Sequence, residues 1–382
     1  MKKHLQQITI ILNICFLLSS IAINAQMRGI SLPPDGGNQK SVAIQYIGLV
    51  EAKITYRSPN IIRQRSKENR KGNIWGKLIP YGTGKNDAVS IWRAGANENT
   101  LFSVSHDVLI NGQKLPKGTY GLFMIPTVNE WTIIFSKENR SWGTYSYDQK
   151  EDFLRIKVKP FDGEFNQWLS YEFIERTENK AKVALKWDEL KVPFTIEVPN
   201  SKDLYIESIR NDLRDGARWD SASLVEAASY CIKNNVNLEE ALVWADRAIN
   251  YRNVGQKTFR TYYEKSKVLS LLGRTEEAEE TIIKALSTLV FDPMGMYWEG
   301  KRLLQVYDAG TKEMALRVFE QNKKRFPKNK FIVHLGLAEV NTALNNREKA
   351  IKHWKIVLKN VPTEFKNKIS EYKIQLEKLQ NI

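Results

Sequence analysis

The chain has 382 residues and a formal net charge of +15, and its lysines and arginines are scattered along the sequence rather than clustered. This length predicts two domains that are stabilised by ordinary hydrophobic burial. The basic excess is compatible with anionic glycans or lipid headgroups, but the scattered charges and the lack of a binding motif argue against nucleic acid.

Residues 1–25 have the pattern of a secretory signal peptide. Two lysines precede an apolar run over 8–23, and cleavage is predicted after Ala25. The alternative is an uncleaved membrane anchor, but polar residues interrupt the run, and no second run of about twenty apolar residues follows. We therefore expect an exported protein, periplasmic or extracellular, with no transmembrane helix in the mature chain. Its only cysteine would be Cys231, which excludes an intramolecular disulfide.

After an expected flexible segment at 26–40, residues 41–199 alternate between apolar and polar with the period of half-buried strands. One such run is predicted to place five side chains on a single face: Phe102, Val104, His106, Val108 and Ile110. Asn111-Gly112 then predicts a type I′ hairpin, because both residues tolerate positive φ. Short strands at close spacing predict an antiparallel β-sandwich or jelly-roll-like domain, and the pattern leaves sandwich and barrel open.

Beyond a predicted linker at 200–218, the periodicity becomes helical. Four alanines, each after a polar turn, are predicted near the start of the second helix of a pair: Ala241, Ala278, Ala315 and Ala350. Their separations of 37, 37 and 35 residues are close to a 34-residue helical-hairpin repeat. Residues 219–362 therefore resemble tetratricopeptide repeats, with 363–382 as a capping helix. The predicted fold class is β plus α, a β-sandwich followed by an α-solenoid; the alternative for the second half is an ordinary helical bundle.

The first half also resembles a family of secreted proteins, found mostly in Bacteroidetes, that is named domain of unknown function 2911. The matching segments are YRSP (56–59), LIPYG (78–82), IWRAGANE (91–98), GTYGLFMIP (118–126), WGTYSYD (142–148) and LRI (154–156). Two segments depart from the family pattern: residues 63–65, where a Gly-Arg step is usual, and a small polar insertion at 83–90. The resemblance implies location and fold but brings no established activity.

The best site candidates by chemistry are Arg93, Asn97 and Glu98. Arg93 offers a planar fork of donors, Asn97 a donor and an acceptor, and Glu98 a charge or a general base. The alternative is a structural role in which Arg93 pairs with Glu98 and Asn97 satisfies backbone groups. His106 is a further acid or base candidate, although its predicted place on an apolar face favours a buried structural histidine.

Four aromatic residues are candidates for stacking on sugar rings, or alternatively for packing at a sheet edge: Trp92, Trp142, Tyr145 and Tyr147. Glycan is therefore a possible partner of the β-domain. With three histidines in the mature chain, no histidine-rich metal cluster can be built, and no phosphate loop or nucleophile elbow occurs. We expect no metal and no cofactor.

The first helices of such repeats line a concave surface that typically receives a peptide or a partner helix. Alignment on the four alanines predicts a basic, tyrosine-rich groove suited to an acidic protein or peptide partner, formed by Tyr230, Lys233, Arg260, Tyr263, Lys267, Tyr297 and Tyr307. The sequence thus favours an exported, non-enzymatic binding or scaffold protein. The alternative is an envelope-associated hydrolase or lyase that acts on a glycan or peptide through the loop of Arg93, Asn97 and Glu98.

Overall fold

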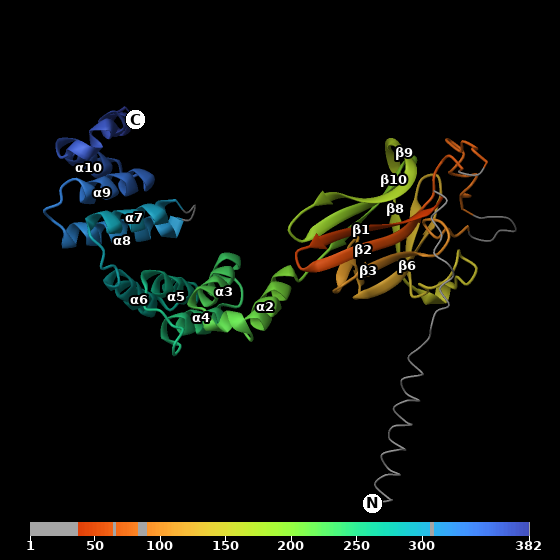
Figure 1. Ribbon diagram of the computed structural model, residues 1–382, viewed down its shortest axis with the longest axis horizontal. Helices are drawn as coiled ribbons and strands as arrows, with labels where there is room; N and C mark the ends of the chain where they lie inside the picture. The colour runs from red at the N-terminus through yellow and green to blue at the C-terminus, as the bar shows by residue number, and fades with distance from the viewer. Residues whose placement is uncertain (1–36, 64–65, 83–89, 306–308, 382) are drawn as a thin grey trace, which may run out of the picture. The chain divides into compact units, whose positions relative to one another are not determined.

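A computed structural model describes residues 37–63, 66–82, 90–305 and 309–381. They form two compact units that divide between Ser201 and Lys202, and each unit is described by itself (Figure 1). The predicted signal peptide, residues 26–36 of the predicted flexible segment, most of the insertion at 83–90 and the groove candidate Tyr307 lie outside the described residues.

The first unit consists of two antiparallel sheets. The larger sheet has six strands in the order β1 (Gln39–Ile47), β2 (Val50–Ser58), β3 (Thr100–Val104), β6 (Gly118–Ile125), β7 (Trp131–Ser136) and β8 (Asp152–Val158). The smaller sheet has the order β5 (Gln113–Leu115), β4 (Val108–Ile110), β10 (Lys180–Glu197) and β9 (Phe161–Arg176). A short 3₁₀ helix, η2 (Gln149–Glu151), precedes β8.

The term sandwich is an approximation for this unit. After β2 the chain leaves the six-stranded sheet and pairs with β9 of the other sheet. The amide of Leu169 donates to the carbonyl of Pro59 (3.0 Å), and the amide of Ile61 donates to the carbonyl of Gln167 (2.9 Å). Main-chain hydrogen bonds therefore link the two sheets along one edge.

The core between the sheets follows the predicted alternation. Along β2 every second side chain is buried, and each intervening one is partly exposed. Phe102, Phe135 and Phe194 come from both sheets and pack edge to face with ring centroids 5.2 to 5.8 Å apart. The predicted β-domain is thus confirmed as two packed antiparallel sheets.

The predicted single strand over residues 102–110 is wrong. β3 ends at Val104, and β4 begins at Val108 in the other sheet, with bends between them. His106 lies at this corner, where it is half-buried and its Nδ1 is 2.9 Å from the Ser105 hydroxyl. The following turn is confirmed: Asn111 (φ 47°) and Gly112 (φ 83°) both have the positive φ that a type I′ hairpin requires.

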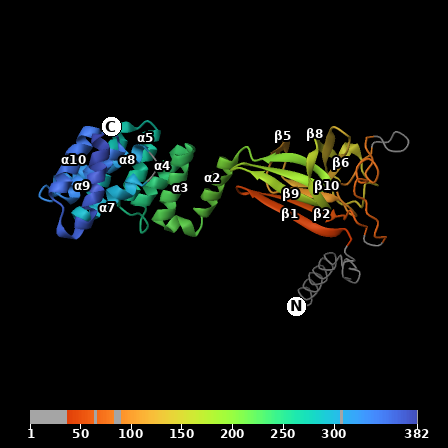
Figure 2. The ribbon, with the colours of Figure 1, turned by 90° about the horizontal axis from the view of Figure 1, so that it is seen from above.

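The second unit is a tetratricopeptide-like array of four helix pairs. The pairs are α3 (Ser221–Asn234) with α4 (Leu238–Asn250), α5 (Phe259–Leu271) with α6 (Thr275–Ser287), α7 (Pro293–Leu304) with α8 (Ala309–Arg325), and α9 (Ile332–Ala343) with α10 (Arg347–Lys359). The two helices of each pair pack against each other (Figure 2). The four predicted alanines lie in α4, α6, α8 and α10 and are buried, which lets the paired helices approach closely.

The ends of this unit are also helical. The segment predicted as a linker contains α2 (Ser201–Asp212) and η3 (Gly216–Trp219), and Ile206 and Leu213 pack into the same core as α3 and α4. At the other end η4 (Thr363–Lys368) and α11 (Ile369–Gln380) follow the last pair, and Tyr372 buries its ring there. Within the ranges described above, no helix is both long and apolar enough to span a bilayer.

Candidate functional site

Main-chain hydrogen bonds close the loop at residues 91–99 against the six-stranded sheet. Trp92 and Met124 exchange both backbone bonds (2.8 and 2.7 Å), and the Trp92 indole N–H donates to the carbonyl of Gly95 (3.0 Å). The carbonyl of Ala94 accepts from the hydroxyls of Tyr171 (2.8 Å) and Thr100 (3.0 Å). A Cβ on Gly95 would lie 2.6 Å from the Thr100 hydroxyl, so only glycine fits here. These hydrogen bonds and the close contact at Gly95 therefore hold the backbone of this loop in one conformation.

Glu98 pairs with Arg57, not with Arg93. The Arg57 guanidinium donates two hydrogen bonds of 2.8 Å to the Glu98 carboxylate, and these bonds lower the pKa of that carboxyl. Asn97 has a positive φ of 60°, and its backbone carbonyl accepts from the amide of Gly143 (3.0 Å). The structure therefore does not bring Arg93, Asn97 and Glu98 together as one site, and the predicted structural pair between Arg93 and Glu98 is replaced by another.

Arg93 instead faces an open pocket of about 640 Å³ at the loop end of the β-domain. The side chain is half-buried, and its Nε is buried without a hydrogen-bond partner among the described residues. Burial lowers the pKa of this guanidinium, against a smaller opposite effect of Tyr145. The pocket is lined by Gly37, Asn38, Pro59, Asn60, Ile62, Arg63, Glu68, Arg70, Leu78, Ile79, Trp92, Arg93, Gly95, Ala96 and Trp187.

Two further arginines on the pocket wall were not among the predicted site residues. Arg70 donates to the carbonyls of Asn60 and Ile61, and burial lowers its pKa, against an opposite effect of Glu68 and with a smaller contribution from Arg63. Arg63 is exposed and lies 3.9 Å from the Glu68 carboxylate, a long and solvent-screened contact. The only sequence signal for this wall was the departure from the family pattern at residues 63–65.

Four tryptophans form a cluster behind the pocket. Trp92 and Trp187 contribute to the lining, stacked with centroids 6.3 Å apart, and Trp75 packs edge to face on both and on Trp131. Trp92 is thus a core residue, and the prediction that its ring stacks on a sugar is wrong because almost none of it is exposed. Trp187 precedes a β-bulge at Asp188 of β10, a local irregularity that sequence periodicity does not reveal.

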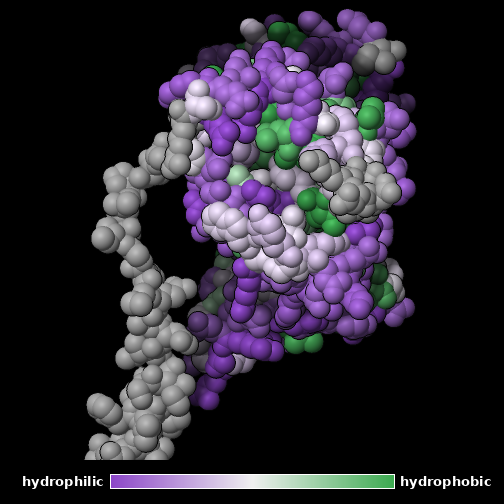
Figure 3. All heavy atoms as spheres, turned by 90° about the vertical axis from the view of Figure 1, so that its right-hand side faces the viewer, coloured by the Kyte–Doolittle hydropathy of each residue, from purple (hydrophilic) through white to green (hydrophobic). Residues whose placement is uncertain are grey.

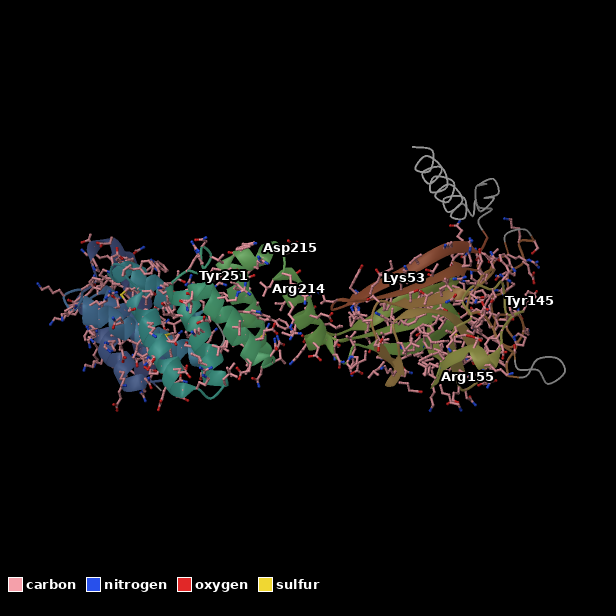
Figure 4. All side chains as sticks on the ribbon, turned by 90° about the horizontal axis from the view of Figure 1, so that it is seen from below. Lys53, Tyr145, Arg155, Arg214, Asp215 and Tyr251 are labelled. Atoms are coloured by element: carbon pink, nitrogen blue, oxygen red, sulfur yellow. The ribbon has the colours of Figure 1, made fainter. Side chains whose placement is uncertain are left out.

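The aromatic loop beside Arg93 divides into exposed and structural residues. Trp142 is 58% exposed and Tyr145 is 92% exposed, and Figure 4 shows Tyr145 at the loop end of the β-domain. The Tyr147 hydroxyl instead donates to Asp152 (2.6 Å) and accepts from Arg155 (2.9 Å), and burial followed by the Asp152 bond raises its pKa to about 12. Only Trp142 and Tyr145 are therefore available to a ligand.

This loop also contacts the pocket arginine. A Cβ on Gly143 would lie 3.9 Å from Nη1 of Arg93 and 3.2 Å from the Tyr145 ring, so the Arg93 guanidinium lies close to this loop. Viewed toward this end of the molecule, the surface is mostly hydrophilic with separate hydrophobic patches (Figure 3).

The predicted groove of the helical unit is not a continuous exposed surface. Lys233 and Arg260 are exposed, but Tyr263 (8% exposed) and Tyr297 (7%) belong to the core. The Tyr297 hydroxyl is 3.2 Å from Glu339, which also binds Lys301 (2.7 Å).

The remaining groove candidates are also partly engaged. Lys267 pairs with Glu264 (2.7 Å) and covers the Tyr263 ring, while Tyr230 packs on Tyr205 with centroids 5.7 Å apart. Cys231 is buried in α3, and burial raises the pKa of its thiol to about 11, which keeps it unreactive. In the part of the chain that the structure describes, no group of three or more His, Cys, Asp or Glu could hold a metal ion.

Comparison with solved structures gives only distant similarity. A tetratricopeptide repeat protein from Parabacteroides merdae is 16% identical with a TM-score of 0.26, over 47% of this chain and 68% of that one. The Cut9–Hcn1 hetero-tetramer of APC/C is 14% identical with a TM-score of 0.25, over 47% of this chain and 33% of that one. The MamA RS-1 ArsTM double mutant is 18% identical with a TM-score of 0.21, over 42% of this chain and 94% of that one. TM-scores this low do not support a conclusion about fold or function.

No curated protein matches the sequence. The match to a family model, in contrast, coincides with one structural unit: it begins one residue before β1 and ends within β10, and so leaves out the helices. Residues 38–196, the two-sheet domain with the Arg93 pocket, match the family described as "Protein of unknown function (DUF2911)".

Proposed function

We propose that the protein is an exported, non-enzymatic binding protein whose β-domain holds a small ligand in the Arg93 pocket. One observation carries the proposal: a half-buried arginine faces an open pocket while its buried Nε lacks an acceptor. A buried donor without a partner costs about 1–3 kcal/mol, more when charged, and an acceptor on a bound ligand removes that cost.

Binding is favoured over catalysis by the other residues at the pocket. The alternative, an envelope-associated hydrolase or lyase, requires a second acid or base converging on Arg93. Among the described residues that line the pocket only Glu68 is such a group, and its side chain is 56% exposed beside Arg63. Glu98 is bound to Arg57, and His106 lies at the corner between β3 and β4.

A glycan is the ligand that the pocket rim supports best. Exposed Trp142 and Tyr145 beside Arg93 provide ring faces on which a sugar can lie, and large exposed aromatics commonly mark binding sites. The helical unit is proposed as the platform for a protein or peptide partner, since arrays of helix pairs present extended surfaces, here with Lys233 and Arg260 exposed.

Export is part of the proposal and rests on the signal-peptide pattern of residues 1–25. Protein recovered from its native host is expected to begin within a few residues of Gln26. N-terminal sequencing that finds the two starting lysines on a membrane-embedded species would contradict this.

The binding function is tested with the full mature chain and a broad panel of neutral and charged oligosaccharides and metabolites, read by thermal shift and calorimetry. Arg93→Met is expected to weaken binding of any hit at least tenfold. Arg176→Met, an exposed arginine at the end of β9 outside the pocket lining, is the matched control and should bind normally. Hits that bind Arg93→Met as tightly as wild type would place the site elsewhere.

A further inference from the structure

Resting on the proposed binding function, we propose that the pocket ligand is an acidic sugar. Its carboxylate would be held by Arg93 with Arg70 and Arg63, and an adjoining sugar ring would lie on Trp142 and Tyr145. Four features of the site indicate this class of ligand: the charge of the pocket lining, its donors without acceptors, the volume of the pocket, and the position of the exposed aromatics.

The charge of the described pocket lining favours an anion. This lining contains three arginines and one glutamate, and the glutamate makes only a 3.9 Å contact with Arg63. Burial acts against the charged forms of Arg70 and Arg93; at Arg70 the charge of Glu68 opposes this effect, and the charge of Arg63 adds to it. A carboxylate among these guanidinium groups offsets both effects, because it supplies the opposite charge inside a partly desolvated site.

Two donors of the pocket lining also lack acceptors. Arg93 Nε and the indole N–H of Trp187, a lining residue that is 1% exposed, are buried without a hydrogen-bond partner in the described part of the chain. Guanidinium groups match the two oxygens of a carboxylate with paired, charge-assisted hydrogen bonds. The site therefore offers two buried donors that an acceptor on a ligand can satisfy.

The size of the pocket and its aromatics extend the ligand beyond a bare anion. A volume of about 640 Å³ is in the range of small-molecule sites and is far larger than a free carboxylate needs. Arg93 lies next to Gly143, which Trp142 and Tyr145 flank at a distance of one or two residues. A carboxylate at Arg93 therefore leaves the rest of its ring, or the next ring of a chain, beside these exposed aromatics.

Calorimetry with the mature chain and defined oligosaccharides tests the inference. The probes are tetragalacturonate, its fully methyl-esterified form, which has the same rings without the charge, and a sulfated oligosaccharide of equal length. We expect tetragalacturonate to bind, the methyl ester to bind at least tenfold more weakly, and binding to weaken with salt. Equal binding of the ester, or preference for the sulfated probe, would overturn the carboxylate assignment.

Three variants separate this inference from the proposed function. Arg70→Met should weaken the binding of tetragalacturonate at least tenfold. Glu68→Gln should strengthen this binding several-fold, because it removes the negative charge of the acidic lining residue. Trp142→Ala with Tyr145→Ala should weaken the tetramer tenfold while leaving the melting temperature unchanged, since both side chains are exposed. Arg93-dependent binding of neutral ligands alone would refute the inference but keep the binding function; no Arg93-dependent binding of any ligand would refute both.

Discussion

At the residue scale, the partners of a charged side chain decide its role. Arg93 and Glu98 are close in sequence and chemically complementary, yet Glu98 binds Arg57 on β2, and Arg93 keeps an unpaired donor in the pocket. The same loop thus holds an ion pair at Glu98 and, at Arg93, the group that we propose binds the ligand.

Replacing these two residues should therefore have different effects on stability. Glu98→Gln is expected to lose less than about 1 kcal/mol at pH 7, because the pair is partly solvent-exposed. Its pKa is lowered in the folded state, so this contribution is present above its ordinary value of 4.5 and disappears as the pH falls through the folded value. Arg93→Met should melt at or above the wild-type temperature, since Arg93 forms no ion pair with any residue that the structure describes. A large loss of stability in Arg93→Met, measured by urea unfolding, would argue for a structural role.

A histidine pair in the last helix pair predicts acid sensitivity. Nδ1 of His334 and Nδ1 of His353 are 2.8 Å apart, so at least one ring must be neutral to accept the hydrogen bond. Burial, His334 and nearby lysines (Lys323, Lys352 and Lys349) lower the pKa of His353 to about 4, and burial also lowers that of His334.

In the unfolded chain both histidines take up protons at a higher pH than in the folded protein. Their contribution to the free energy of unfolding is therefore complete above a pH of about 6.5 and decreases as the pH falls toward 4. The expected loss is about 2 kcal/mol between pH 7 and pH 4, less than the full shift of His353 corresponds to, because solvent reaches part of this ring and screens the interaction. Urea unfolding at several pH values should show this slope in the wild type and a flatter profile in the double variant His334→Gln, His353→Gln. Identical slopes in the two proteins would exclude the pair as the cause.

At the element scale, the helix pairs approach each other where a small residue faces a large one. Phe319 of α8 is fully buried between glycines of two first helices: a Cβ would lie 2.4 Å from its ring at Gly300 of α7 and 2.3 Å at Gly336 of α9. These contacts fix how α7, α8 and α9 pack.

Gly336→Ala should therefore destabilise the protein by about 1–3 kcal/mol through overpacking, although alanine favours helices. Gly216→Ala in η3 is the matched control, because an added Cβ there meets nothing within 4 Å. Adding Phe319→Leu to Gly336→Ala should recover part of the loss in a urea titration. If Gly336→Ala alone is as stable as wild type, the close packing of these helices is not a constraint.

At the scale of the whole molecule, each half contains its own core. The helical unit buries α2 and η3 with α3 and α4, and the two sheets enclose their own aromatic core. The boundary therefore falls in the short turn at Pro199-Asn200 rather than throughout residues 200–218.

When expressed as separate fragments, residues 37–200 and residues 201–381 should each unfold cooperatively. Limited proteolysis of the full chain should release two fragments cut near residue 200, the first rich in β-structure and the second helical by circular dichroism. Cleavage within α2 before any cut at this turn, or a non-cooperative 37–200 fragment, would refute the division.

Sequence patterns predicted the elements well where neighbouring residues alone determine the conformation. Asn111-Gly112 forms the expected turn because positive φ is a property of those two residues, and the four alanines mark second helices because their spacing repeats. The corner at His106 was missed because an alternating apolar pattern does not show that a strand changes sheets between Val104 and Val108. The groove prediction failed similarly, since helical phase alone placed the core residues Tyr263 and Tyr297 on the surface.

The sequence by itself determined the two-part architecture, the antiparallel strands and the helix pairs, and it singled out the loop around Arg93 as a candidate site. These depend on periodicity, turn chemistry and motifs, which act between neighbouring residues. Only the tertiary structure decided that Glu98 pairs with Arg57, that Trp92 is buried, and that Arg63, Arg70 and Trp187 meet Arg93 at one pocket. Those contacts join segments tens of residues apart, and their energies arise from burial and charge in three dimensions, which sequence spacing does not encode.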